Sequence, residues 1–167
     1  MSPAKYWQAT LALCLGSFVV FSNLYTTQPL LPIFQQAFAI TSLEANTSLA
    51  VATLSLGLSL LVYGPLSDAV GRRKIIFFSL TSSLLVTLAL AGVSSFTNLL
   101  ILRAIQGFCL GGLPAVALAY MAEEFSKPAL AKAVGIYIGA NSLGGISGRL
   151  VAGFMADTFS WQASFLA

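Results

Sequence analysis

The chain has 167 residues, of which 57% are hydrophobic and 8% are charged, and its mean hydropathy is +0.89. Soluble domains carry roughly a quarter charged residues, so this composition excludes a water-soluble globular protein. The net charge of +3 comes from basic residues scattered along the chain without interleaved aromatic residues, which argues against a nucleic-acid-binding protein.

The sequence contains few groups that could hold a metal or a cofactor. Histidine is absent, and Cys14 and Cys109 both lie in apolar stretches. Two such cysteines predict neither disulfide bonds nor a metal site. We expect no cofactor and no metal, and without a nucleophile beside a base an intramembrane enzyme lacks its parts.

The apolar residues occur in blocks of roughly 20 residues, the length of a helix that crosses a bilayer. Lys5 followed by an apolar run also resembles a secretory signal, but no Ala-x-Ala-like cleavage pattern follows Phe21, so the first block is predicted to stay as a span. We predict an all-α membrane protein with five transmembrane helices and the opening of a sixth, at about residues 7–31, 45–66, 75–93, 99–120, 128–154 and 161–167.

Local signals indicate where these helices begin and end. Pro29 and Pro32 are expected to bend or stop the first helix. Thr41 and Glu44 have the spacing of a capping box before the second helix. Pro128 suits the first turn of the fifth helix.

The loops predict the orientation, because short loops rich in Lys and Arg stay in the cytoplasm. If the spans alternate, the loop basic residues share one side, and they are Lys5, Arg72, Arg73, Lys74, Lys127 and Lys132. The amino terminus is therefore predicted to be cytoplasmic.

The turn after the second span reads Gly64-Pro-Leu-Ser-Asp68-Ala-Val-Gly71-Arg72-Arg73-Lys. This resembles the Gly-x-Leu-x-Asp-(Arg/Lys)-x-Gly-Arg-Arg signature of the major facilitator superfamily, with Ala69 in place of the usual basic residue. Gly64 would allow close helix approach and Gly71 a sharp turn. The resemblance implies a gate in which Asp68 docks on the second half of the carrier. The alternative is an ordinary basic cytoplasmic turn.

The fourth span contains Arg103-Ala-Ile-Gln106-Gly107, which resembles the Arg-x-x-Gln-Gly motif of proton-coupled members of that family. Arg103 lies roughly 9 Å below the outer end of its helix. It therefore either faces a functional cavity or extends its long side chain to the headgroups.

The fifth span contains a series of small residues, Gly135, Gly144, Gly148, Ala152 and Gly153. The spacing resembles the fifth-helix signature of the family's antiporters, Gly-x8-Gly-x3-Gly-Pro-x2-Gly-Gly. Arg149 replaces the proline on which the kink of that helix depends in the signature, and we expect Arg149 to extend toward the outer headgroups. Helix packing alone would also explain the small residues.

The resemblance covers the whole chain. Tyr25 and the segment Gln28-Pro-Leu-Leu-Pro32 resemble bacterial drug and sugar efflux carriers, and Asp157, Trp161 and Phe165 resemble the family's entry into helix six.

Charged and polar residues divide into two groups along the chain. The acidic ones all lie at helix ends or in loops, where Glu123 or Glu124 either pairs with Arg72 or Arg73 or is simply solvated. Polar residues inside spans usually face a bundle interior or an aqueous cavity. As substrate or coupling candidates we select Asn23, Gln28, Arg103 and Asn141.

These observations predict the first half of a two-half transporter of the bacterial inner membrane, cut at the start of helix six. Its partners would be the bilayer, a small-molecule substrate, protons and the missing second half, with no nucleic acid. The resemblance implies proton-coupled efflux of a small organic molecule by alternating access. The alternative is a truncated, non-transporting remnant or scaffold.

Overall fold

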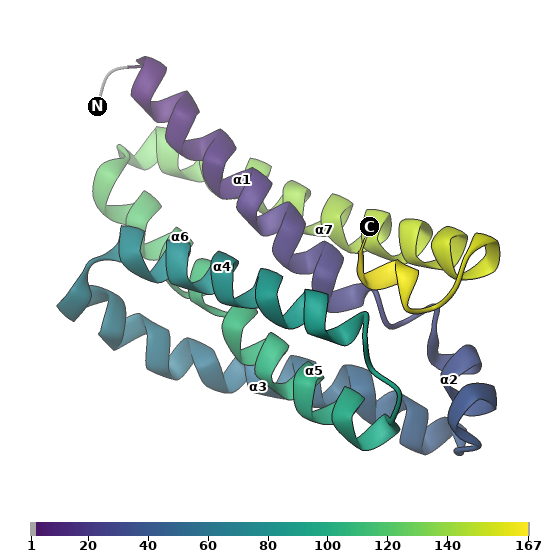
Figure 1. The fold of residues 1–167 in the computed structure, drawn as a ribbon. Helices are drawn as coiled ribbons and strands as arrows, with labels where there is room; N and C mark the ends of the chain where they lie inside the picture. Colours follow the sequence, from purple (N-terminus) through teal and green to yellow (C-terminus); the bar gives the residue numbers. More distant parts are fainter. Residues whose placement is uncertain (1–2, 167) are drawn as a thin grey trace.

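The computed structural model describes residues 3–166, and helices make up nearly all of this part (Figure 1). No strand occurs among these residues. The elements are α1 (Pro3–Tyr25), α2 (Leu31–Phe38), α3 (Ser42–Val70), α4 (Arg72–Leu90), α5 (Phe96–Leu110), α6 (Gly112–Glu124), α7 (Lys127–Thr158) and a 3₁₀ helix, η1 (Ala163–Phe165).

Four stretches are long and apolar enough to cross a membrane, namely Ala4–Tyr25, Ser42–Val70, Arg72–Leu90 and Phe96–Glu124, which joins α5 and α6. The fifth predicted span is present as α7, with 32 residues, but it is not among the four. Glycine, serine, Asn141 and Arg149 dilute its apolar residues between positions 139 and 149. The fold is thus an all-α membrane fold, and the count of five spans stays a prediction.

The first helix ends earlier than predicted. α1 stops at Tyr25, a turn follows over residues 26–30, and Pro32 opens the separate short helix α2. Proline fits the first turn of a helix because its missing N–H would have no partner there. The first helix therefore stops before the proline pair, as expected, and Pro32 opens a new helix.

The capping-box prediction for α3 is confirmed. The Thr41 hydroxyl accepts from the Glu44 N–H at 3.2 Å, and the Thr41 N–H donates to the Glu44 carboxylate at 2.8 Å. The helix then continues through Pro65 to Val70 and ends at Gly71, whose φ of 95° favours glycine. It is longer at both ends than the predicted span.

The fourth predicted span is interrupted at Gly111, which separates α5 from α6. Small residues let neighbouring helices approach closely at this level. A Cβ atom on Gly107 would lie 2.0 Å from the Ala52 carbonyl oxygen of α3, and one on Gly111 would lie 1.7 Å from the Ser59 Oγ. Gly107 and Gly111 thus allow the direct contact of this segment with α3.

The helices lie side by side in a bundle, with α1 along α7 and α3 along α5 (Figure 1). The first turn of α1, the α3–α4 turn and the α6–α7 turn lie at one end, and α2 and the α4–α5 turn lie at the other. The basic residues of the two turns therefore share one end with Lys5. Their cytoplasmic location stays a prediction.

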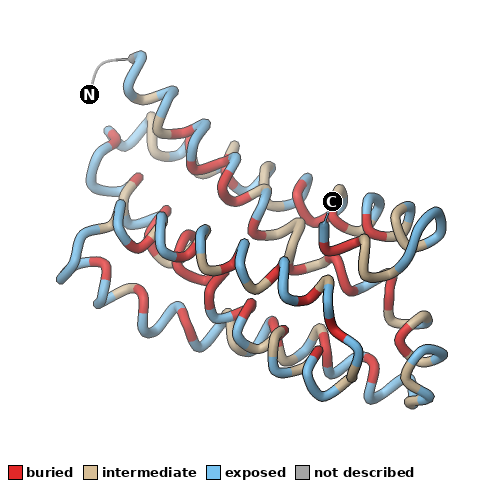
Figure 2. Tube along the Cα trace, viewed as in Figure 1, coloured by how far each residue is buried: buried red, intermediate tan, exposed pale blue. Residues whose placement is uncertain are grey.

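Buried residues follow the helix faces that turn toward one another, and exposed residues follow the outside (Figure 2). Much of this outside is apolar: Leu61 is 74% exposed, Phe77 73% and Leu150 70%. So much exposed apolar surface on three different helices suits lipid and not water.

An aromatic cluster closes the end opposite the amino terminus. Trp161 meets Phe34 edge to face, with the ring centroids 5.3 Å apart, and it also contacts Phe38. The described part of residues 161–167, the predicted opening of a sixth span, forms a turn and η1 over α2. Ala167 lies outside the described residues, and a sixth span is not confirmed.

Candidate functional site

Arg103 lies at the junction of α1, α3 and α5 and is completely buried. Its guanidinium donates to the carbonyl oxygens of Leu24 at 2.7 Å, Asn23 at 3.3 Å and Ser48 at 3.5 Å, and to the Gln106 side chain. Of the two alternatives for Arg103, extension to the headgroups is excluded, because no part of the residue is exposed. It is enclosed within the bundle and does not line the cavity described below.

The early end of α1 explains how this charge is accommodated. The last carbonyl groups of a helix have no partner within it, and they form the negative end of the helix dipole. The N–H of Thr26 donates to the Ser22 carbonyl, and the N–H of Gln28 donates to the Tyr25 carbonyl. The carbonyl oxygens of Asn23 and Leu24 instead accept from Arg103. Arg103 therefore caps the carboxyl end of α1. The carbonyl oxygens there accept from the guanidinium in place of a carboxylate.

Gln106 extends the hydrogen bonds of Arg103 to α4. Its Nε2 donates to the Thr87 Oγ1 at 2.6 Å, and Thr87 Oγ1 lies 3.1 Å from the Asn23 Oδ1. Arg103, Gln106, Thr87 and Asn23, which we call the α1 cap network, thus join three helices. The sequence indicated three of these residues, but it did not indicate Thr87, a hydroxyl inside an otherwise apolar run.

The glycines of the fifth predicted span bring α7 against α1. A Cβ on Gly144 would lie 2.4 Å from the Phe18 carbonyl oxygen, and one on Gly148 would lie 2.3 Å from that of Ser22. The Ser22 hydroxyl also donates to the Gly144 carbonyl at 2.9 Å. Two members of the series behave differently: a Cβ on Gly135 would meet nothing within 4 Å in the described chain, and one on Gly153 would lie 3.8 Å from Pro29.

α7 runs without a break through Arg149, the position where the resembling signature has proline. The Arg149 Nε donates to the Gln28 Oε1, and its guanidinium carbon lies 4.3 Å from the centre of the Tyr25 ring. Arg149 is thus held against the end of α1, which differs from the expected extension toward the headgroups. Asn141 lies two turns earlier on α7 and accepts from the Ser17 hydroxyl.

Charged residues of three helices, α3, α4 and α6, meet at the α3–α4 turn. Arg72 pairs with Glu123 of α6, one of the alternatives that the sequence left open, and lies 3.6 Å from Asp68. Asp68 itself is largely exposed, and one Arg72 nitrogen is buried without a partner in the described chain. The prediction for Gly64 is not met, since a Cβ there would find no atom within 4 Å among residues 3–166.

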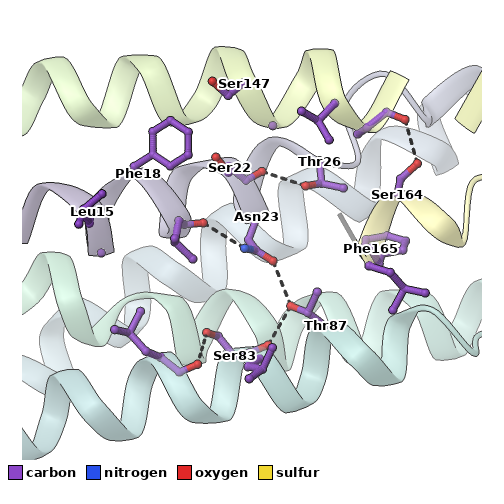
Figure 3. A pocket seen from close by; sticks show the side chains of 18 of the residues that line it. Leu15, Phe18, Ser22, Asn23, Thr26, Ser83, Thr87, Ser147, Ser164 and Phe165 are labelled. Carbon is purple, nitrogen blue, oxygen red and sulfur yellow. Dashed lines mark hydrogen bonds between the residues drawn. The ribbon is translucent and has the colours of Figure 1, made fainter. Parts of the chain in front are cut away.

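A cavity of about 730 Å³ lies between α1, α4, α7 and η1 (Figure 3). Asn23 is the only one of the four substrate or coupling candidates that lines it. Six hydroxyl groups line the wall, and that of Ser147 is among them. The other five donate to backbone carbonyl oxygens and belong to Ser22, Thr26, Ser83, Thr87 and Ser164. The cavity therefore presents an essentially apolar wall.

These observations describe a lipid-facing helical bundle with a buried arginine, close glycine contacts and a charged turn. The sequence profile of the Major Facilitator Superfamily matches residues 13–167. The chain belongs to this superfamily. The match includes the α3–α4 turn, the α1 cap network and the α1–α7 contact.

Several known transporters are similar to this superfamily member. The inner membrane transport protein YnfM of Escherichia coli (strain K12) is 37% identical over 163 residues, which are 98% of this chain and 39% of that protein. The uncharacterized MFS-type transporter YybF of Bacillus subtilis (strain 168) is 40% identical over 153 residues, 92% of this chain and 38% of that protein. The efflux pump FUB11 of Gibberella moniliformis is 31% identical over 128 residues, which are 76% of this chain and 21% of that protein.

The chain spans about two fifths of the length of the two bacterial relatives. Membrane transport, and not enzymatic catalysis, is the role that the relatives indicate.

Proposed function

We propose that the complete gene product is a secondary active transporter of the bacterial inner membrane that exports a small organic molecule in exchange for protons. Alternating access in such carriers is largely rigid-body movement of one half against the other. The single observation that supports this mechanism best is the buried Arg103, which fastens α1 to α3 and α5 through three carbonyl oxygens. A bundle tied in this way moves as one body.

The α3–α4 turn supplies the proposed gate. Asp68 is exposed, yet its partner Arg72 also pairs with Glu123. A movement that brings another charged surface to Asp68 would therefore change the ion pairs that connect α3, α4 and α6. The efflux pump among the relatives supports the direction of transport, and the relatives favour a carrier over a non-transporting remnant.

The proton-binding group is proposed to lie outside residues 3–166. The five acidic residues of the chain are Glu44, Asp68, Glu123, Glu124 and Asp157, and each lies in the first or last turns of a helix. A titrating carboxylate for proton coupling is expected inside the membrane. Arg103, whose positive charge favours proton release from a nearby carboxylate, is the coupling candidate of this chain.

The experiment measures proton exchange in everted membrane vesicles that contain the complete gene product. Respiration acidifies the vesicles, and acridine orange fluorescence reports the pH gradient while cationic dyes, neutral antibiotics, sugars and aromatic carboxylates are added in turn. A transported compound should dissipate the gradient in wild-type vesicles. Without such dissipation beyond that of empty-vector vesicles, the proposed function is wrong.

Arg103→Gln tests the role of the arginine in the same assay. It removes the charge and leaves the carbonyls of Asn23 and Leu24 without their donor, so we expect exchange to disappear. Lys132→Gln is the matched control, because it removes one exposed positive charge from α7 beside Trp7, 5.1 Å away, and should leave exchange unchanged. Equal exchange by the two variants would contradict a role for Arg103.

A further inference from the structure

Arg149, Tyr25 and Gln28 form a second polar cluster, which is separate from the cavity. The guanidinium of Arg149 stacks over the Tyr25 ring at 4.3 Å, and its Nε donates to the Gln28 side chain. Both partners belong to the last turn of α1 or the turn after it. The side chain of Arg149 is therefore fixed by two contacts before any ligand arrives.

The outer edge of this guanidinium remains available. An arginine has five N–H donors, and in the described part of the chain only the Nε of Arg149 has a hydrogen-bond acceptor. No carboxylate pairs with it there, since both ion pairs among residues 3–166 involve Arg72. Arg149 is partly exposed, and Gln28 is exposed. The two terminal nitrogens of Arg149 therefore have no hydrogen-bond acceptor among residues 3–166.

Gly145 makes room for the arrangement. A Cβ at this position would lie 3.1 Å from the Cδ2 of Tyr25 and 3.7 Å from the Nη1 of Arg149. The first distance is too short for the ring to stay where it is. The glycine therefore lets Tyr25 lie flat beneath the arginine.

The cluster is separate from the cavity, two of whose α7 residues are turned to the other side of the line where α1 meets α7. Gly144 and Gly148 form that contact, and at about 100° per residue Gly145 and Arg149 are turned to one side of it and Ser147 and Val151 to the other. None of Tyr25, Gln28, Gly145 and Arg149 lines the cavity. The cluster is a separate site with its own polar chemistry.

We propose that Arg149, held by Tyr25 and Gln28, binds the carboxylate of the transported molecule. Two parallel N–H donors on a planar guanidinium match two oxygens of one oxyanion, and the ring beneath stabilises the cation when water is excluded. The inference rests on the proposed transport function. A lipid phosphate has the same oxyanion chemistry, so the experiment must separate these two sources.

The experiment measures binding of radiolabelled benzoate to the complete gene product in nanodiscs of phosphatidylcholine, which has no net charge. We expect wild type to bind benzoate, benzamide not to compete, and Arg149→Gln to weaken binding about tenfold or more, since two hydrogen bonds to a charged group are lost. Arg149→Lys should be intermediate, because an ammonium keeps the charge but not the two-pronged geometry. Lys132 is a cation of the same helix that also lies over an aromatic ring, and Lys132→Gln should bind benzoate as wild type does.

A lipid arm and the vesicle assay complete the test. Mass spectrometry of protein purified from membranes containing phosphatidylglycerol shows whether wild type retains this lipid and Arg149→Gln does not. Such retention without benzoate binding, or equal benzoate binding by wild type and Arg149→Gln, overturns the inference. The proposed function is untouched by either result if another compound still dissipates the pH gradient, whereas loss of all exchange in wild type refutes that function whatever the benzoate result.

Discussion

Replacing Gly144 with alanine tests the α1–α7 contact most directly. The added Cβ would lie 2.4 Å from the Phe18 carbonyl oxygen and 2.9 Å from the Phe18 Cα. Both are backbone atoms and cannot rotate away, so α7 has to move from α1 by about 1 Å to restore a normal contact. Overpacking of this kind costs about 1–3 kcal/mol.

The movement also strains the bond from the Ser22 hydroxyl to the Gly144 carbonyl, now 2.9 Å long. Hydrogen bonds between membrane helices contribute about 0.6 kcal/mol on average. Alanine also gains up to about 1 kcal/mol of helix propensity over glycine. We therefore expect Gly144→Ala to lower the free energy of unfolding by about 1–3 kcal/mol. Unfolding of the purified gene product by sodium dodecyl sulfate in mixed micelles, followed by tryptophan fluorescence, gives this quantity.

Gly139→Ala is the matched control on the same helix. A Cβ at Gly139 meets nothing within 4 Å in the described chain, so the variant should be as stable as wild type or gain up to about 1 kcal/mol from helix propensity. If Gly144→Ala proves as stable as Gly139→Ala, the close contact between α1 and α7 is refuted.

Two further predictions concern the charged end of the bundle. Asp68→Asn should change the stability by less than about 1 kcal/mol, because an exposed ion pair contributes little, but it should slow exchange in the vesicle assay several-fold; exchange at the wild-type rate would reduce Asp68 to a loop residue. A reporter enzyme that works only in the cytoplasm should be active when fused near Lys74 and inactive when fused near Ser95, and the opposite pattern would contradict the predicted orientation.

Local patterns were enough to predict several features of the fold. The Thr41 and Glu44 spacing identified the start of α3, because a capping box uses only atoms within one turn. The pairing of Arg72 with Glu123 was one of the alternatives that the sequence offered, because both residues lie near turns at the same end of the bundle. The apolar blocks indicated where the long helices lie but not their ends, and the proline pair after Tyr25 did not indicate the separate helix α2.

The candidate sites were less predictable because their contacts join distant parts of the chain. Arg103 stood out as a charge in an apolar run, yet its acceptors are carbonyl groups, which every residue has. Arg149 also stood out, but its partner Gln28 is 121 residues away. No local signal connects the two, and the packing of α1 along α7 had to be known first.

The use of main-chain acceptors by Arg103 has a consequence for the evolution of this site. Any amino acid at position 24 or 48 supplies the same carbonyl oxygen to the guanidinium. Those positions are free to drift as long as the helices keep their course, whereas the arginine is not. Statistical coupling between columns of aligned relatives should therefore miss the contact of Arg103 with Leu24 and Ser48, although it binds three helices together.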